Sequence, residues 1–323
     1  MRYHSLGDHG PRVSAVGLGC YTFGRYLDLP MTRRVVEAAL DAGVTFLDTA
    51  DVYGGTRSEE FLGRILGGRR GEVVLATKFG QSADLGYGAD AGPKGGATYI
   101  RRAIDASLRR LRTDYIDLYQ MHVPDPAVPI EDTLACLHGL VREGKVRYIG
   151  CSNFDAARLR EAAVAAGIAG TTAFISAQNR WSLLEREAES DLVPAAVHLG
   201  LGVLPYFPLA NGLLTGKVRR GGTVAQGTRL ADHPYWLTEQ RLATVEALDR
   251  WAKKHGRSLL EVAIGGLAAR RGCASVITGA SSAAQIVANA AASDWVPSTN
   301  DLAEIDAIAP SPTHPPADRR RAA

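Results

Sequence analysis

The alternation of short apolar runs with helix-like segments is the feature that most constrains the fold of this chain. Counting from Val16–Gly19, about eight apolar runs alternate with segments of helical periodicity. The runs are continuously apolar, as expected for strands that are covered on both faces. The pattern predicts an α/β fold, a parallel (β/α)8 or TIM barrel, in a single domain over residues 1–308.

The predicted elements follow in order along the chain. The strands are Val16–Gly19, Phe46–Asp48, Val73–Lys78, Tyr115–Met121, Val146–Gly150, Phe174–Gln178, Gly202–Tyr206 and Ser275–Thr278. The helices are Thr32–Asp41, Ser58–Leu66, Thr98–Arg110, Ile130–Arg142, Asp155–Ala166, Glu185–His198, Thr238–His255 and Ser258–Arg271. A β-hairpin is predicted within residues 2–14.

Two long connections, Gly80–Ala97 and Pro208–Leu237, interrupt this alternation. We expect both at the C-terminal rim of the barrel, as lids or cofactor clamps. A doubly wound sheet is the alternative architecture. It usually carries G-x-G-x-x-G at the first strand–helix turn, which residues 17–24 do not match.

Composition excludes several classes of function. The net charge is +3 without a basic stripe, so we expect no nucleic-acid partner. None of the four cysteines forms a C-x-x-C pair, so no metal site is expected and a reducing compartment is favoured. The chain shows neither a signal core nor an apolar run of membrane-spanning length, which predicts a cytoplasmic protein without a membrane partner. The Pro- and Arg-rich tail 309–323 is predicted to be disordered.

Polar residues close several of the predicted strands. Asp48, Lys78 and His122 each stand at a strand end, and Tyr53 follows Asp48 by five residues. Since active sites of barrels lie at this rim, we expect the four side chains to meet. A buried Asp needs a cation or several donors, and Lys78⁺ beside Tyr53 would lower the tyrosine pKa from about 10. The alternative is a purely structural Asp–Lys pair with two ordinary polar loop residues.

Several longer motifs occur in a fixed order. They are Asp48-Thr49-Ala50 with Tyr53-Gly54, Ala76–Gly80, Asp117–His122, Gly144–Phe154, Ala177-Gln178-Asn179 and Pro208–Lys217. Together they resemble the aldo-keto reductases over nearly the whole chain, roughly Tyr3 to Ile308. Gly279–Ser282 with Gln285 and Asn289 is most similar to the branch that holds bacterial aldehyde reductases and potassium-channel β subunits.

The resemblance implies a catalytic tetrad of Asp48, Tyr53, Lys78 and His122. It also implies hydride transfer from NADPH to an aldehyde or ketone. Tyr53 would protonate the developing alkoxide, and Lys78, tied to Asp48, would lower the pKa of Tyr53. His122 would orient the carbonyl by a hydrogen bond.

The resemblance further implies which residues bind the cofactor. The nicotinamide carboxamide would be held by Ser152, Asn153 and Gln178, with Tyr206 stacked on the ring. The pyrophosphate or adenosine would be clamped by Lys217 and Arg229, and the adenosine and its 2′-phosphate would be surrounded by Gly279, Ser281, Gln285 and Asn289. The set is completed by Gly19, Cys20, Tyr21, Asp48, Phe207, Pro208, Leu209 and Gly212. The chain departs from many members in having no Lys or Arg between Arg271 and Arg319, and Ala288 where Glu is frequent. NADPH is the expected cofactor, and NADH is the alternative.

The substrate is expected to be a small-molecule carbonyl compound that contacts Tyr21, Tyr87 and Trp181, although such aromatics also serve as core anchors. A homo-oligomer is compatible with the sequence. Two other functions stay open. One is an NADP(H)-binding, redox-sensing partner protein with slow or no turnover, and the other is a Schiff-base enzyme that uses Lys78 as nucleophile.

Overall fold

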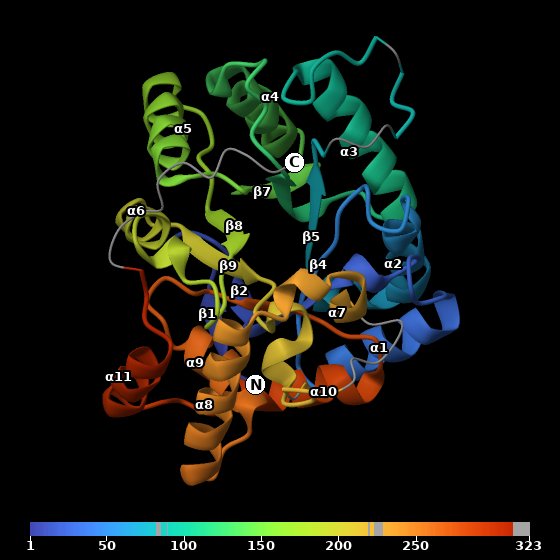
Figure 1. Ribbon diagram of the computed structural model, residues 1–323. Coiled ribbons are helices and arrows are strands. Elements are labelled where there is room, and N and C mark those ends of the chain that lie inside the picture. Colours follow the sequence, from blue (N-terminus) through green and yellow to red (C-terminus); the bar gives the residue numbers. More distant parts are fainter. Residues whose placement is uncertain (82–84, 89, 219, 223–228, 313–323) are drawn as a thin grey trace.

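The computed structural model describes residues 1–81, 85–88, 90–218, 220–222 and 229–312. Its strands are β1 (Tyr3–Ser5), β2 (Arg12–Ser14), β3 (Val16–Gly19), β4 (Phe46–Asp48), β5 (Val74–Phe79), β6 (Ile116–Met121), β7 (Val146–Ser152), β8 (Ser176–Arg180), β9 (Gly202–Tyr206) and β10 (Val276–Gly279). The last eight form one parallel sheet in the order β10-β3-β4-β5-β6-β7-β8-β9. A bridge between Val203 and Cys273 joins its two edges. The predicted TIM barrel is therefore confirmed (Figure 1).

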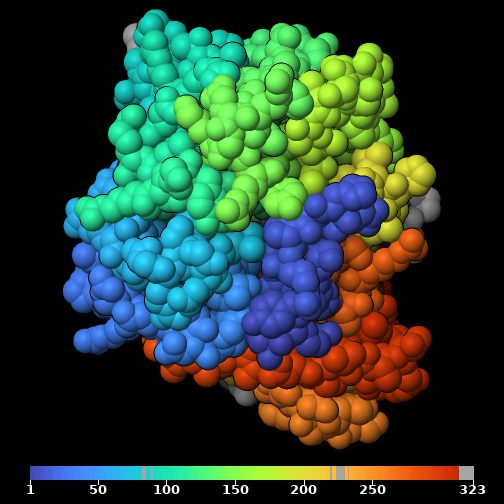
Figure 2. Space-filling view, turned by 180° about the vertical axis from the view of Figure 1, so that it is seen from behind, coloured from blue at the N-terminus to red at the C-terminus, as the bar shows by residue number. Residues whose placement is uncertain are grey.

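Alternate residues of these strands fill the inside of the barrel, because successive side chains of a strand point to opposite faces. The interior cluster contains Phe46, Ala76, Leu118, Leu204, Ala274 and Ile277. The antiparallel pair β1–β2 adds Leu6 and Val13 to this cluster. The predicted hairpin thus closes the N-terminal end of the barrel, on the face seen in Figure 2.

Helices cover the outside of the sheet (Figure 1). They are α1 (Leu29–Asp41), α2 (Arg57–Leu66), α3 (Ala97–Leu111), α4 (Ile130–Arg142), α5 (Ala156–Ala169), α6 (Leu192–His198), α7 (Arg229–Asp232), α8 (Glu239–Lys254), α9 (Leu259–Ala268), α10 (Ala283–Ala292) and α11 (Thr299–Ile308). Short 3-10 turns are η1 (Cys20–Thr22), η2 (Gly67–Glu72), η3 (Glu187–Glu189), η4 (Ala210–Thr215) and η5 (Pro234–Trp236). Most predicted helices are confirmed to within three residues at each end.

The prediction of one helix over Glu185–His198 is wrong, because the segment divides into η3 and α6. Pro194 explains the division. Proline is tolerated only in the first turn of a helix, where the missing N–H costs nothing, so α6 begins two residues before it, at Leu192.

Helices α10 and α11 were not predicted, although both carry a start signal. The Ser282 hydroxyl accepts a hydrogen bond from the backbone N–H of Gln285. Ser298 and Asp301 form a reciprocal capping box at the start of α11. The spacing of a serine and a Gln or Asp three residues later is the sequence signature of such starts.

The two long connections leave the C-terminal ends of β5 and β9, as predicted. Their residues 82–84, 89, 219 and 223–228 lie outside the described part of the chain, as do residues 313–323 of the predicted tail. Ala309 is buried, and its carbonyl oxygen accepts a hydrogen bond from Arg186. Among the described residues, no helix combines the length and apolar character needed to cross a membrane.

Candidate active site

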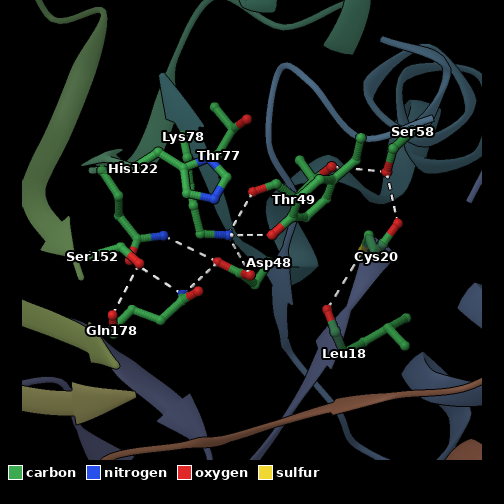
Figure 3. A network of polar contacts seen from close by, with 12 residues as sticks. Leu18, Cys20, Asp48, Thr49, Ser58, Thr77, Lys78, His122, Ser152 and Gln178 are labelled. Atoms are coloured by element: carbon green, nitrogen blue, oxygen red, sulfur yellow. Dashed lines mark hydrogen bonds and ion pairs between the residues drawn. The ribbon is translucent and has the colours of Figure 1, made fainter. Parts of the chain in front are cut away.

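A buried ion pair lies at the C-terminal end of the barrel (Figure 3). Asp48 ends β4 and Lys78 stands in β5; their side chains are 3% and 0% exposed. Lys78 Nζ lies 2.6 Å from Asp48 Oδ2 and also donates to the Thr49 carbonyl oxygen at 3.0 Å. Burial alone would lower the pKa of Lys78, but Asp48 and Tyr53 outweigh burial and raise it. Lys78 therefore carries its charge inside the barrel.

Two glutamines complete the surroundings of Asp48. Gln120 Nε2 and Gln178 Nε2 donate to Asp48 Oδ1, at 3.0 and 2.8 Å. The carboxylate thus accepts hydrogen bonds on both oxygens, as a buried charge requires. Gln120 was not predicted as a site residue. It precedes His122 by two residues, so the strand period of two already places both on the inner face.

Tyr53 reaches the ion pair from the loop that follows β4. Its hydroxyl lies 3.4 Å from Lys78 Nζ. The next residue, Gly54, has φ of +61° and packs so closely that an added Cβ would lie 2.5 Å from the carbonyl oxygen of Phe23. A glycine is therefore required there, and this tight turn fixes the direction of the Tyr53 side chain.

Burial raises the pKa of Tyr53, and Lys78 offsets this increase only in part. Asp48 acts in the same direction as burial. The expected net lowering of the Tyr53 pKa is therefore wrong for the protein in this structure, although Lys78 acts with the expected sign. A hydroxyl that keeps its proton is still suited to donate it to a developing oxyanion.

His122 lies beside Tyr53, with ring centroids 6.0 Å apart in an edge-on arrangement. Burial and the nearby Lys78 lower the pKa of His122 to about 3. The imidazole is therefore neutral near pH 7, with one N–H donor and one acceptor nitrogen. Its Nδ1 is buried and has no hydrogen-bond partner among the described residues. The structure thus brings all four predicted tetrad residues together.

The ends of β7, β8 and β9 form a connected polar row next to His122. Ser152 Oγ donates to the Gln178 carbonyl oxygen at 2.9 Å, and Asn153 Nδ2 donates to the His122 carbonyl oxygen at 2.9 Å. The Tyr206 hydroxyl donates to Asn153 Oδ1 at 2.7 Å. Hydroxyl and amide groups beside a part-buried aromatic ring fit a nicotinamide with its carboxamide.

The loop after β9 has an unusual backbone. Phe207, Ala210, Asn211 and Gly212 all have positive φ, at 55°, 48°, 57° and 104°. Turned backbone of this kind presents N–H groups that can bind an anion. Pro208 and Leu209 belong to the same loop, and the predicted Lys217 follows it as an exposed residue. Arg229 begins α7, and its side chain lies outside the described part.

The predicted adenosine residues gather where β10 leads into α10. Gln285 Oε1 accepts hydrogen bonds from Ser281 N and Ser281 Oγ, at 2.7 and 2.9 Å. Asn289 Nδ2 donates to the Gly279 carbonyl oxygen at 3.4 Å.

The segment from Gly19 to Tyr21 lies beside this start of α10. Thr22 Oγ1 donates to the Ala280 carbonyl oxygen at 3.1 Å. Cys20 is fully buried, and its carbonyl oxygen accepts a hydrogen bond from Ser58 Oγ at 3.1 Å.

The three substrate candidates have different surroundings. Tyr21 lies against Tyr53, with ring centroids 5.3 Å apart. Trp181 is 1% exposed and donates from Nε1 to Glu189 at 2.8 Å, so its assignment to the substrate is wrong: its ring belongs to the core. The Tyr87 hydroxyl is also turned elsewhere, toward Asp51, at 3.3 Å.

Asp51 and Glu59 form a buried acidic pair that was not predicted. Arg110 Nε lies 2.7 Å from Glu59 Oε2, and Arg110 Nη2 donates to the Tyr87 hydroxyl at 3.3 Å. Thr77 Oγ1 donates to the other oxygen of Glu59 at 2.6 Å. This cluster underlies the loop that carries Tyr53.

Comparison with known proteins agrees with this geometry. Residues 15–310 match the sequence profile of the Aldo/keto reductase family. A probable voltage-gated potassium channel subunit beta of Oryza sativa subsp. japonica is 35% identical over 310 residues, covering 92% of each chain. The uncharacterized oxidoreductase YrpG of Bacillus subtilis (strain 168) is 38% identical over 272 residues, or 82% of each chain. The aldo-keto reductase YhdN of the same organism is 33% identical over 322 residues, covering 95% of this chain and 93% of its own. The chain belongs to the Aldo/keto reductase family.

Proposed function

We propose that this protein reduces an aldehyde or ketone to the alcohol, with NADPH as hydride donor and Tyr53 as proton donor. One observation carries the proposal: the Tyr53 hydroxyl lies 3.4 Å from a charged lysine, Lys78, which is itself paired with Asp48 at 2.6 Å. A lysine held in this way stabilises the phenolate that remains once the proton has left.

The residues divide the work on the carbonyl oxygen. NADPH, when bound, supplies the hydride to the carbonyl carbon. Tyr53 gives its proton to the oxygen, so that hydride and proton together produce the alcohol. Neutral His122 donates a hydrogen bond to the same oxygen and orients it. General acid catalysis of this kind contributes typically about 10²–10⁴-fold.

The cofactor would lie along the rim, from the polar row at β7–β9 to the start of α10. Ser152, Asn153 and Gln178 would bind the carboxamide, and the Tyr206 ring would stack on the nicotinamide. The 2′-phosphate of NADPH would rely on donors in the first turn of α10 and on the backbone N–H and hydroxyl of Ser281, which would exchange their hydrogen bonds to Gln285 for the phosphate. Since no Lys or Arg occurs between Arg271 and Arg319, NADH is the alternative donor.

All four cysteines are free, which suits the reducing cytoplasm.

A second function is a cofactor-binding partner protein that senses redox state and turns over slowly or not at all. The observation that favours it is the 35% identity to a probable potassium channel subunit beta. The four residues Asp48, Tyr53, Lys78 and His122 weigh against the form without turnover, because a protein that only binds the cofactor has no need of a proton donor beside a buried lysine.

Fluorescence titration with NADPH and with NADH, followed by assays with aromatic, aliphatic and sugar aldehydes, tests the proposal. Nucleotide binding with aldehyde-dependent oxidation of NADPH is the expected result. Tight binding without turnover on any aldehyde would favour the redox-sensing partner. Failure to bind either nucleotide would contradict both functions.

A further inference from the structure

Arg180 is a charged residue at the barrel mouth to which the proposed reaction assigns no role. It ends β8, two residues after Gln178. The strand period of two places both on one face, and the Gln178 amide reaches Asp48 inside the barrel. At a rise of about 3.3 Å per residue, Arg180 leaves the strand about 7 Å nearer to the mouth than Gln178.

The sheet register places Arg180 directly beside Tyr206. Tyr206 is connected to the tetrad, because its hydroxyl bonds Asn153, which bonds the His122 carbonyl oxygen. The guanidinium carbon of Arg180 lies 5.3 Å from the ring centroid of Phe207. Arg180 therefore lies at the same rim as the tetrad, beside the row of hydrogen bonds that leads to the backbone of His122.

The charge of Arg180 is only partly balanced. Its Nη1 lies 3.6 Å from Glu185 Oε1, and Arg241 Nη2 lies 3.4 Å from the same oxygen. One carboxylate thus stands between two guanidinium groups, so Glu185 is shared and does not neutralise Arg180 alone. Arg241 packs over the Trp236 ring at 4.3 Å and is 28% exposed, whereas Arg180 is 45% exposed. Arg180 is the member of this group that is more open to solvent.

We infer that Arg180 is a specificity-determining residue that selects carbonyl substrates bearing an anionic group, a carboxylate in the simplest case. The inference rests on the proposed reductase function and names the substrate class for the same site. A planar guanidinium can bind a carboxylate through two parallel hydrogen bonds. The adjacent ring of Phe207 and the buried ring of Trp236, 5.7 Å away, restrict the positions open to the guanidinium.

The positive charge of Arg180 could instead bind a phosphate of the cofactor. The experiment must therefore distinguish binding of the substrate from binding of the cofactor. Two aldehydes of similar size provide the comparison: 4-carboxybenzaldehyde, which is an anion, and methyl 4-formylbenzoate, which is neutral. Values of kcat/KM for both are measured at saturating NADPH in the wild type and in Arg180→Gln, Arg180→Lys and Arg241→Gln. The Kd for NADPH is measured separately by fluorescence.

We expect the wild type to favour the carboxylate about tenfold, the size of a charge-assisted hydrogen bond at a partly exposed site. Arg180→Gln should remove this preference while changing kcat/KM for the ester less than about twofold. Arg180→Lys should keep part of the preference. Arg241→Gln, the matched control near the same Glu185, should keep most of it, because the guanidinium that would bind the carboxylate is still present. The preference should also shrink between about 20 and 300 mM NaCl.

The possible results distinguish a failure of the proposed reductase function from a failure of the role assigned to Arg180. A wild type that reduces neither aldehyde would contradict the proposed function. Turnover with an unchanged anion preference in Arg180→Gln would overturn the inference alone. Equal losses for both aldehydes, together with a raised Kd for NADPH, would assign Arg180 to the cofactor and overturn the inference as well.

Discussion

The Tyr87 hydroxyl donates a hydrogen bond to Asp51 Oδ2 at 3.3 Å and so connects the long loop after β5 to the loop that carries Tyr53. Asp51 is fully buried. Burial, followed by the charge of Glu59, raises the pKa of Asp51 to about 7, against opposing effects of Arg110 and Tyr87. The cluster therefore adds a titration near neutral pH beneath the loop of the proton donor.

The sign of its effect on stability follows from the raised pKa of Asp51. Between about pH 4 and pH 7 the folded protein holds a proton that the unfolded chain has lost, so Asp51 contributes stability that disappears as pH rises through 7. In Asp51→Asn, the fall in unfolding free energy between pH 5 and pH 8 should shrink by roughly 2–4 kcal/mol. Urea unfolding at several pH values measures this. Asp41→Asn, at an exposed position, serves as the control and should keep the wild-type slope. If the unfolding free energy of Asp51→Asn changes with pH as it does in the wild type, the raised pKa of Asp51 is contradicted.

His122 should act in the opposite direction. Its pKa falls to about 3 in the folded protein, whereas unfolded histidine titrates at about 6.5. Below about pH 6.5 this histidine binds a proton in the unfolded chain but stays unprotonated in the folded protein, so stability is lost as pH falls. His122→Asn should lessen the loss of unfolding free energy between about pH 6.5 and pH 4. Parallel urea titrations of His122→Asn and wild type provide the measurement. If the unfolding free energy falls equally in both proteins between about pH 6.5 and pH 4, His122 accepts a proton in the folded protein as it does in the unfolded chain.

Replacing Tyr53 by Phe removes the proposed proton donor without changing the ring. We expect kcat to fall by about 10²–10⁴-fold, while the Kd for NADPH stays within about threefold. Stopped-flow turnover and fluorescence titration test the two halves separately. Tyr26→Phe, at an exposed tyrosine, should retain wild-type kcat. Native turnover in Tyr53→Phe would assign the proton to another group.

Breaking the Asp48–Lys78 pair should be costly, because it leaves one buried charge without its partner. Lys78→Met should lower the unfolding free energy by about 3–5 kcal/mol and abolish turnover. The double variant Asp48→Asn/Lys78→Met should be more stable than the two single effects predict when summed, since it removes both charges. Denaturant unfolding of the four proteins gives the coupling energy, and strictly additive effects would mean that the pair is not energetically linked.

Local patterns in the sequence were sufficient to predict the barrel and to predict that Asp48, Lys78 and His122 lie close together at one rim. Apolar runs set the strands, and the polar residue at each run's end places Asp48, Lys78 and His122 on one rim. The division of the predicted helix at Pro194 and the capping serines before α10 and α11 were also readable, through rules that act within one helical turn.

What the sequence could not provide depends on contacts between distant residues. Tyr87 could not be assigned to the Asp51–Arg110 cluster before the path of its loop was known. The burial of Trp181 against Glu189 depends on how η3 folds back on the barrel. The direction of the Tyr53 pKa required a comparison between burial and the nearby Lys78 charge, and only three-dimensional structure gives the extent of burial.

The closure of the barrel has a consequence for how the chain acquires its fold. β3 pairs with β10, and the hydrogen bond from Thr278 to Gly17 spans 261 positions in the sequence. Closing so large a loop costs entropy before any contact repays it, and pairing between such distant strands is intrinsically slow. Until α9 and β10 have been synthesised, β3 and β9 remain unpaired edges that can recruit other chains. A chain whose synthesis stops in α8 would therefore expose the unpaired edges of β3 and β9. By covering these edges, the last fifth of the chain would reduce the tendency of the protein to aggregate.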